Sequence, residues 1–186
     1  MGTLIIFIAM ILVAAVAASV LIQTTGSLQN KALQTGKTAT REIGTSVQTV
    51  SLFGEDGSDQ DIEYMYYTIK LVSGSEDMKF SDSLIIMSTD NSSSEFNYNS
   101  SVDCDQTDNF STTSYGYGVK YSIQGNNYKS GYLSRGDVVK ICFRSTRNLI
   151  EDDEIRIVFI PKNGVPHTIN PITPELMVDK RIYIYP

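Results

Sequence analysis

The first thirty residues of the chain contain no Asp, Glu, Lys, Arg or His, and the first charged side chain is Lys31. Residues 3–22 are a run of apolar and small side chains, which would form a helix about 30 Å long, the thickness of the hydrocarbon core of a bilayer. A helix that is apolar on every side has to be shielded from water by lipid or by other helices. The run lacks the leading basic residues of a cleavable secretory signal, so we expect the mature protein to keep it.

Apolar residues at helical spacing continue beyond this run. Gly26, Gly36 and Gly44 each weaken an isolated helix by about 1 kcal/mol relative to Ala, but no proline interrupts the pattern. A helix from residue 2 to residue 50 would be about 70 Å long, too long for a small domain to bury. We therefore predict a helical domain at residues 1–52 with an apolar stripe at Leu28, Ala32, Ala39, Ile43, Val47 and Val50.

Two functions fit such a helix. A single-pass membrane anchor explains the apolar run, but not the stripe that follows it or the lack of flanking Lys and Arg, which normally fix orientation. Packing against sister copies explains both features, and small residues such as Ala14 and Ala18 allow helix backbones to approach closely. We favour a polymer subunit with this packing surface: Leu4, Ile5, Phe7, Ile8, Met10, Ile11, Ala14, Ala18 and Leu21.

The pattern changes from helical to alternating in residues 53–186, which are predicted to form an antiparallel β-sandwich. The fold class is therefore α+β, a long N-terminal helix followed by the sandwich. Residues 54–61 are expected to be a loop, and residues 90–113 a long exposed insertion between strands. The β-rich segments are residues 62–72, 83–88, 115–123, 137–144, 154–160 and 181–185.

Both cysteines, Cys104 and Cys142, lie in this polar part of the chain. If it is extracellular, one disulfide would close a loop of about 39 residues and stabilise the fold by about 4 kcal/mol; two separate thiols are the alternative. Three Asn-x-Ser triplets begin at Asn91, Asn99 and Asn109, where N-linked glycans would lie on an exposed loop. Sequence rich in Ser and Asn also produces such triplets by chance.

Metal binding and catalysis are weakly supported. The net charge is −6 and the bases are scattered, which argues against nucleic acid as a partner. His167, the single histidine, is expected in a surface turn, and no recognised catalytic motif or small-molecule site occurs. We therefore expect no enzyme activity and no required cofactor. Two acidic groups offer ligands for Ca²⁺ without EF-hand spacing, or are solvated surface acids: Asp56, Asp59, Asp61 and Glu63, and Asp103, Asp105 and Asp108.

The sequence GTLIIFIAMILVAAVAASVLI at residues 2–22, continuing into QTTGSLQNKALQTGKTATREIGTSV, closely resembles the N-terminal region of archaeal flagellins, the archaellins, which are filament subunits similar to type IV pilins. RGDVVKI at residues 135–141, IVFIPKNG at 157–164 and the terminal IYIYP resemble the end of their β-domain more loosely. The apolar block lacks the Glu that bacterial type IV pilins usually carry. Archaellins have a few residues before GTLI, whereas this chain starts with Met1 and Gly2.

The resemblance implies a subunit made with a short basic leader, which a membrane peptidase of the prepilin type removes. Membrane-inserted copies would then polymerise, alone or with other archaellins, through the membrane assembly machinery into the archaellum, an extracellular filament that rotates for swimming. In that family the N-terminal helices form the core, and an immunoglobulin-like β-domain, often N-glycosylated, faces outward. A non-rotating adhesion pilin and a membrane-anchored extracellular binding domain are the alternatives that the residues leave open.

Overall fold

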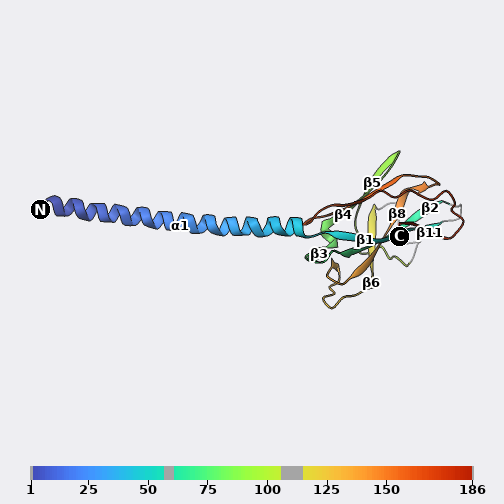
Figure 1. Cartoon of the computed structure of the whole chain (residues 1–186), viewed down its shortest axis with the longest axis horizontal. Coiled ribbons are helices and arrows are strands. Elements are labelled where there is room, and N and C mark those ends of the chain that lie inside the picture. The colour runs from blue at the N-terminus through green and yellow to red at the C-terminus, as the bar shows by residue number, and fades with distance from the viewer. Residues whose placement is uncertain (1, 57–60, 106–114, 186) are drawn as a thin grey trace. The chain divides into compact units, whose positions relative to one another are not determined.

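The computed structural model describes residues 2–56, 61–105 and 115–185. The chain divides into two compact units, Met1–Thr40 and Arg41–Pro186. The first consists of most of one helix, α1, and the second contains the end of that helix and all the strands (Figure 1). The predicted class, a long N-terminal helix followed by a mostly antiparallel β-domain, is confirmed.

Helix α1 spans Gly2–Gly44, which is 43 residues or about 65 Å of helix. No residue of α1 is buried in the single chain. Four of its six threonines satisfy their own hydroxyl groups, because each donates to a carbonyl one turn earlier. The bonds run from Thr24 to Val20 (2.9 Å), Thr35 to Lys31 (2.9 Å), Thr38 to Gln34 (3.0 Å) and Thr40 to Gly36 (2.9 Å).

The helix ends at Gly44, earlier than predicted. Strand β1 begins at Val47, so the domain boundary placed at residue 52 falls inside β1 and has to be moved to residues 44–47. Val47 and Thr49 are buried while Gln48 and Val50 are exposed, which is the two-residue period of a strand. The three-residue step from Val47 to Val50 fits a helical stripe equally well, which is why the sequence alone places the end of the helix too late.

The six predicted β-segments are all strands, and β8 runs further than expected, to Leu149. The structure adds β1 and four shorter strands to them. The bounds are β1 Val47–Asp56, β2 Ile62–Leu71, β3 Met78–Lys79, β4 Ser83–Thr89, β5 Ser92–Tyr98, β6 Gly116–Ile123, β7 Tyr132–Leu133, β8 Val138–Leu149, β9 Ile155–Pro161, β10 His167–Ile169 and β11 Arg181–Tyr185, with a 3-10 turn at Phe80–Asp82.

Nine strands form one sheet in the order β10-β9-β4-β5-β6-β8-β2-β1-β11, and β3 pairs with β7 separately. The described pairings are antiparallel except β5–β6, a short parallel contact of two residue pairs. The sheet halves on either side of this contact share one core, to which β2 and β8 contribute Tyr67 and Ile141 and β4 and β9 contribute Ile85 and Phe159. The two halves therefore pack face to face as a sandwich.

Strand β5 corrects the expectation that residues 90–113 form one exposed loop. Ser94 and Phe96 point into the domain while Ser93, Glu95 and Asn97 are exposed. The ring of Phe96 lies 4.9 Å from that of Phe143 on β8, centroid to centroid. The strand was missed because its three serines and its glutamate hide the alternation that the two aromatic residues carry.

A strap of residues 99–105 crosses the outer face of the sheet over β6 and β8. Cys104 and Cys142 form a disulfide with Cα atoms 5.5 Å apart, so the alternative of two free thiols is excluded. The strap covers a second apolar cluster that includes the buried Phe53 and Tyr66. Gly118 on β6 makes room for it, since a Cβ at this position would lie 2.4 Å from the carbonyl oxygen of Val102.

We predict that Gly118→Ala destabilises the β-domain by about 1–3 kcal/mol, because the added methyl group displaces the strap. Denaturant unfolding of the full chain in detergent, followed by its tyrosine signal, measures the change. Ser122→Ala, at an exposed position of the same strand, is the matched control. Equal unfolding midpoints for the two variants would contradict the account of Gly118.

Candidate functional site

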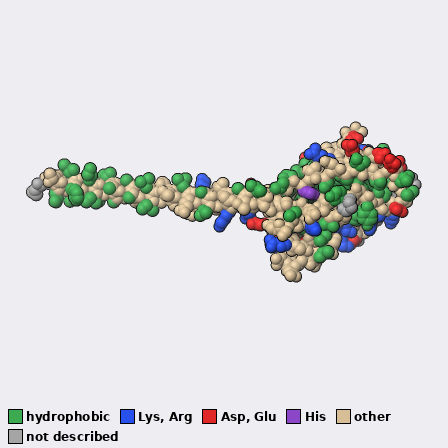
Figure 2. Space-filling model, viewed as in Figure 1, with side chains coloured by type: hydrophobic (Ala, Val, Ile, Leu, Met, Phe, Trp, Pro, Cys, Tyr) green, Lys and Arg blue, Asp and Glu red, His purple; other side chains and the backbone are tan. Residues whose placement is uncertain are grey.

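An extended apolar surface lies along the first half of α1. The predicted packing residues are all exposed in the single chain, with large side chains ranging from 50% exposed at Ile8 to 72% at Met10. Ala14 and Ala18 are exposed as well. Figure 2 shows apolar side chains along this part of the helix and basic ones only further along. This surface is large enough to bind lipid or several other helices.

The second half of α1 is amphipathic rather than apolar on every side. Leu28 and Ile43 belong to its apolar stripe and are both exposed. Leu33 and Lys37 lie one turn apart on a face turned away from that stripe. Lys31 and Lys37 make no ion pair among the described residues. This half can therefore offer an apolar face to one neighbour and a basic face to another.

The candidate glycan acceptors differ in accessibility. Asn91 is exposed in the tight turn between β4 and β5. Asn99 is half-buried at the start of the strap, where its Oδ1 accepts a hydrogen bond from the Ser101 N–H (2.9 Å). Gly116 allows this close packing, because a Cβ there would lie 3.0 Å from that of Asn99. Asn109 lies outside the described residues.

The described members of the two acidic groups do not gather into a cation site. Glu63 pairs with Arg144 (3.2 Å), and Asp105 pairs with Lys120. Among the residues described, no three His, Cys, Asp or Glu side chains are grouped so that they could hold a metal ion. Asp61 accepts a hydrogen bond from Asn148, and Asp59 and Asp108 lie outside the described residues.

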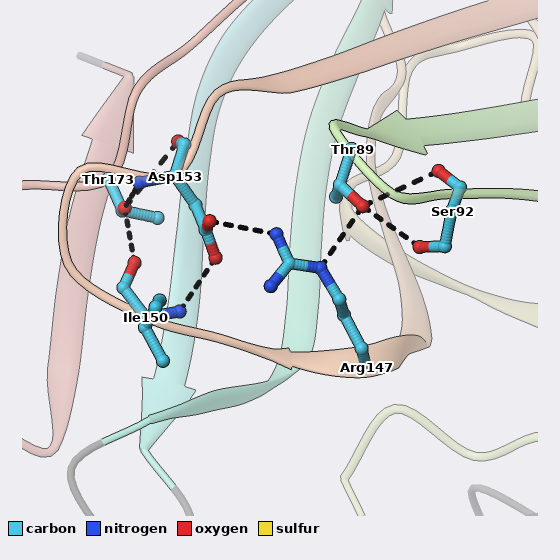
Figure 3. Close-up of polar contacts among 6 residues, drawn as sticks. All are labelled: Thr89, Ser92, Arg147, Ile150, Asp153 and Thr173. Carbon is cyan, nitrogen blue, oxygen red and sulfur yellow. Dashed lines mark hydrogen bonds and ion pairs between the residues drawn. The ribbon is translucent and has the colours of Figure 1, made fainter.

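One polar network fixes three chain segments at one end of the β-domain (Figure 3). Arg147 on β8 donates to Asp153 (2.8 Å) in the β8–β9 turn and to Thr89 (3.2 Å) at the end of β4. Thr173 donates to the carbonyl of Ile150 (2.6 Å) and accepts the Asp153 N–H (2.7 Å). Because Asp153 and Thr173 are buried, these bonds form with little competition from water. The same network supports the turn that carries Asn91.

His167 is predicted to lie in a surface turn, but the structure places it in the edge strand β10. Its Nε2 is 2.9 Å from the Thr49 hydroxyl on β1, which is 3.0 Å from the Tyr67 hydroxyl. Burial raises the pKa of Tyr67 to about 12 and lowers the pKa of His167 below its usual 6.5. With the bond from the Val165 N–H to the Thr45 carbonyl (2.9 Å), this contact connects β10, at one edge of the sheet, to β1, which lies next to the other edge. The position indicates a structural role for His167.

Comparisons with known proteins agree on one family. The model for archaeal-type flagellin matches residues 1–170. The chain is 30% identical to flagellin B3 of Halobacterium salinarum over 182 residues, which cover 96% of this chain and 89% of that protein. It is 31% identical to flagellin B2 of Methanocaldococcus jannaschii over 189 residues, covering 93% and 87% of the two chains.

Solved structures share the fold at lower sequence identity. The archaeal flagellum of Methanospirillum hungatei matches with a TM-score of 0.71 at 16% identity, covering 97% of both chains. The crystal structure of flagellin FlaB1 from Methanocaldococcus jannaschii matches with a TM-score of 0.66 at 16% identity, covering 76% of this chain and 97% of that one. The first match includes the part of this chain that forms α1.

We predict that the β-domain loses stability as the pH falls below 6.5, and that His167→Gln removes part of this loss. The folded state lowers the pKa of His167, so the unfolded state binds the proton more readily and acid favours unfolding. Glutamine keeps a hydrogen-bonding group near Thr49 but does not titrate. Unfolding midpoints of both proteins at neutral and mildly acidic pH test this, and parallel pH profiles would contradict it.

Proposed function

Because this chain belongs to the archaeal-type flagellin family, we propose that it polymerises through α1 into the shaft of the archaeal flagellum, with its β-domain facing outward. As a member of this family it is a structural subunit of an extracellular filament. The finer proposal is that residues 2–22 pack against the same residues of sister copies, or of other archaellins. The resulting filament would rotate and drive swimming.

The observation that carries this proposal is the exposure of an uncharged helical surface that no part of the described chain covers. If assembly hides about 1,000 Å² of this surface per subunit, it contributes about 25 kcal/mol before entropy losses. Ala14 and Ala18 lie one turn apart among larger side chains, so a neighbouring helix can approach closely there. A polymer of copies supplies such neighbours along most of the helix.

The β-domain has the properties of an outer shell. It carries twelve of the 15 basic residues and twenty of the 21 acidic ones, and its core is complete without α1. A disulfide holds the strap in place, which suits an oxidising extracellular location. The charged surface of the domain is therefore suited to contact with water, and its core does not depend on the shaft.

Before assembly, we expect each subunit to be anchored in the membrane through α1. The helix is long and apolar enough to cross a bilayer, as judged from its length and composition. The family resemblance adds removal of a leader by a prepilin-type peptidase, followed by transfer to the membrane assembly machinery. Movement from lipid to the shaft exchanges one apolar environment for another, so it requires no refolding of the helix.

Asn91 is the proposed main site of N-linked glycosylation. Its exposed turn leaves the amide accessible, whereas the side chain of Asn99 packs against the sheet and closes a local turn. A glycan at Asn91 would project from the surface at one end of the domain. This proposal rests on accessibility and on the Asn-Ser-Ser triplet that begins there.

We predict that Ala18→Asp abolishes filaments while the β-domain stays folded. A charge within the apolar contact costs about 3 kcal/mol per subunit. Ala18→Ser, which adds a small polar group without charge, is the matched control and should still assemble. Electron microscopy of cells scores filaments, and protease resistance of the membrane-bound chain reports folding. Normal filaments from Ala18→Asp would contradict the proposal.

We also predict that Asn91→Gln lowers the glycan mass of purified filaments more than Asn99→Gln does. Intact-mass spectrometry of each variant, made in an archaeal host that glycosylates proteins, measures the loss. Asn126→Gln lies outside any Asn-x-Ser/Thr triplet and should change nothing. Full glycosylation of Asn99 together with an unglycosylated Asn91 would contradict the proposal that Asn91 is the main site.

A further inference from the structure

Exposed apolar side chains lie in two neighbouring segments at one end of the β-domain, which the Thr173 hydroxyl joins through its bond to the Ile150 carbonyl. We refer to these side chains as the patch; they are Ile150, Ile172, Leu176 and Val178, which are 55% to 79% exposed. These side chains come from the β8–β9 turn and from the segment between β10 and β11. Such a group on a polar domain normally marks a contact surface.

Hydrogen bonds and a buried side chain of the β-domain fix the segments that carry the patch. Figure 3 shows Thr173 bonded to the carbonyl of Ile150, with Asp153 held by Arg147. Ile172, next to Thr173, pairs with Glu154 through a backbone bridge. Met177 is buried in the core between Leu176 and Val178, so its two neighbours are turned outward. The apolar side chains therefore face solvent as part of an ordered surface rather than of a loose loop.

Four acidic side chains lie beside Ile150 and Ile172. Asp90, Glu151, Asp152 and Glu154 are exposed, and none of them forms an ion pair with another described residue. Asp90, Glu154 and Ile172 line one shallow depression together with a single base, Arg156. This acid-rimmed patch repels anionic lipid and nucleic acid and attracts a partner that is both apolar and basic.

The same chain carries a segment with these complementary properties. Helix α1 contains three bases and one acid, whereas the rest of the chain has an excess of acids. Leu33 and Lys37 lie together on a face turned away from the apolar stripe, and neither is buried. If the stripe packs into the shaft, this face is left to meet the surrounding shell. A lysine covered there without a counter-ion would be costly.

We propose that, in the polymer, the acid-rimmed patch binds the Leu33–Lys37 face of α1 from a neighbouring copy. This inference rests on the proposed function, because it requires a polymer of copies. Leu33 contacts the apolar centre, and the Lys37 ammonium reaches the acidic rim while its stem covers apolar surface. The contact links the shell of one subunit to the shaft helix of another and adds specificity to an otherwise non-directional apolar association.

A charge-reversal cycle in the full chain tests this contact. Lys37→Glu alone and the double change Glu151→Lys with Glu154→Lys should each raise the fraction of subunits released from purified filaments about fivefold at low salt. All three changes in one chain should return release close to the wild-type level, and high salt should reduce the differences. Glu95→Lys, an exposed reversal outside the patch, is the matched control.

A combined variant that releases more subunits than either parent would overturn the inference, and so would single reversals that behave like wild type. Carbodiimide cross-linking of filaments grown from mixed heavy-isotope and light chains gives a second readout. Cross-links between Lys37 and the patch should join heavy chains to light chains. If these cross-links form only within single chains, the inference is also overturned. Wild-type chains that form no filaments would instead contradict the proposed function.

Discussion

An uncharged helical surface in contact with water is the physical constraint on which this molecule depends. In the single chain α1 has no buried residue, although its first thirty positions carry no charge. The β-domain does not need this surface, because its own core is filled by side chains of both sheet halves. Folding and assembly are therefore separable: the domain folds by itself, and the helix is satisfied only by lipid or by other subunits.

The β-domain places its contact groups on surfaces that are fixed from within. The disulfide and Gly118 hold the strap against the sheet, and the network around Arg147 and Asp153 joins the turns at one end. His167 and Thr49 connect the first strand to the far edge strand. The Asn91 turn and the acid-rimmed patch both lie beside the Arg147 network, so a change there would affect both.

Sequence reasoning succeeded where the signal is local and failed where two periods or distant partners compete. Residues 2–22 could be assigned because every side of the helix is apolar, and the main strands because apolar residues alternate. The end of α1 was misplaced because the spacing of Val47 and Val50 fits helix and strand alike. Strand β5 was hidden by serines, and the contact of His167 depends on β1, more than a hundred positions away along the chain. The exposure of the apolar helix was predictable, but the acid-rimmed patch was not, because its side chains come from separate segments of the chain.

The threonines of α1 have a consequence for how the protein travels. Because the hydroxyls of Thr24, Thr35, Thr38 and Thr40 already donate to carbonyls of the helix, they need no acceptor from water or from a neighbouring molecule. Removing water from these four hydroxyl groups leaves none of their donors unpaired. These four side chains can thus pass from membrane to polymer, or back again, with their hydrogen bonds unchanged.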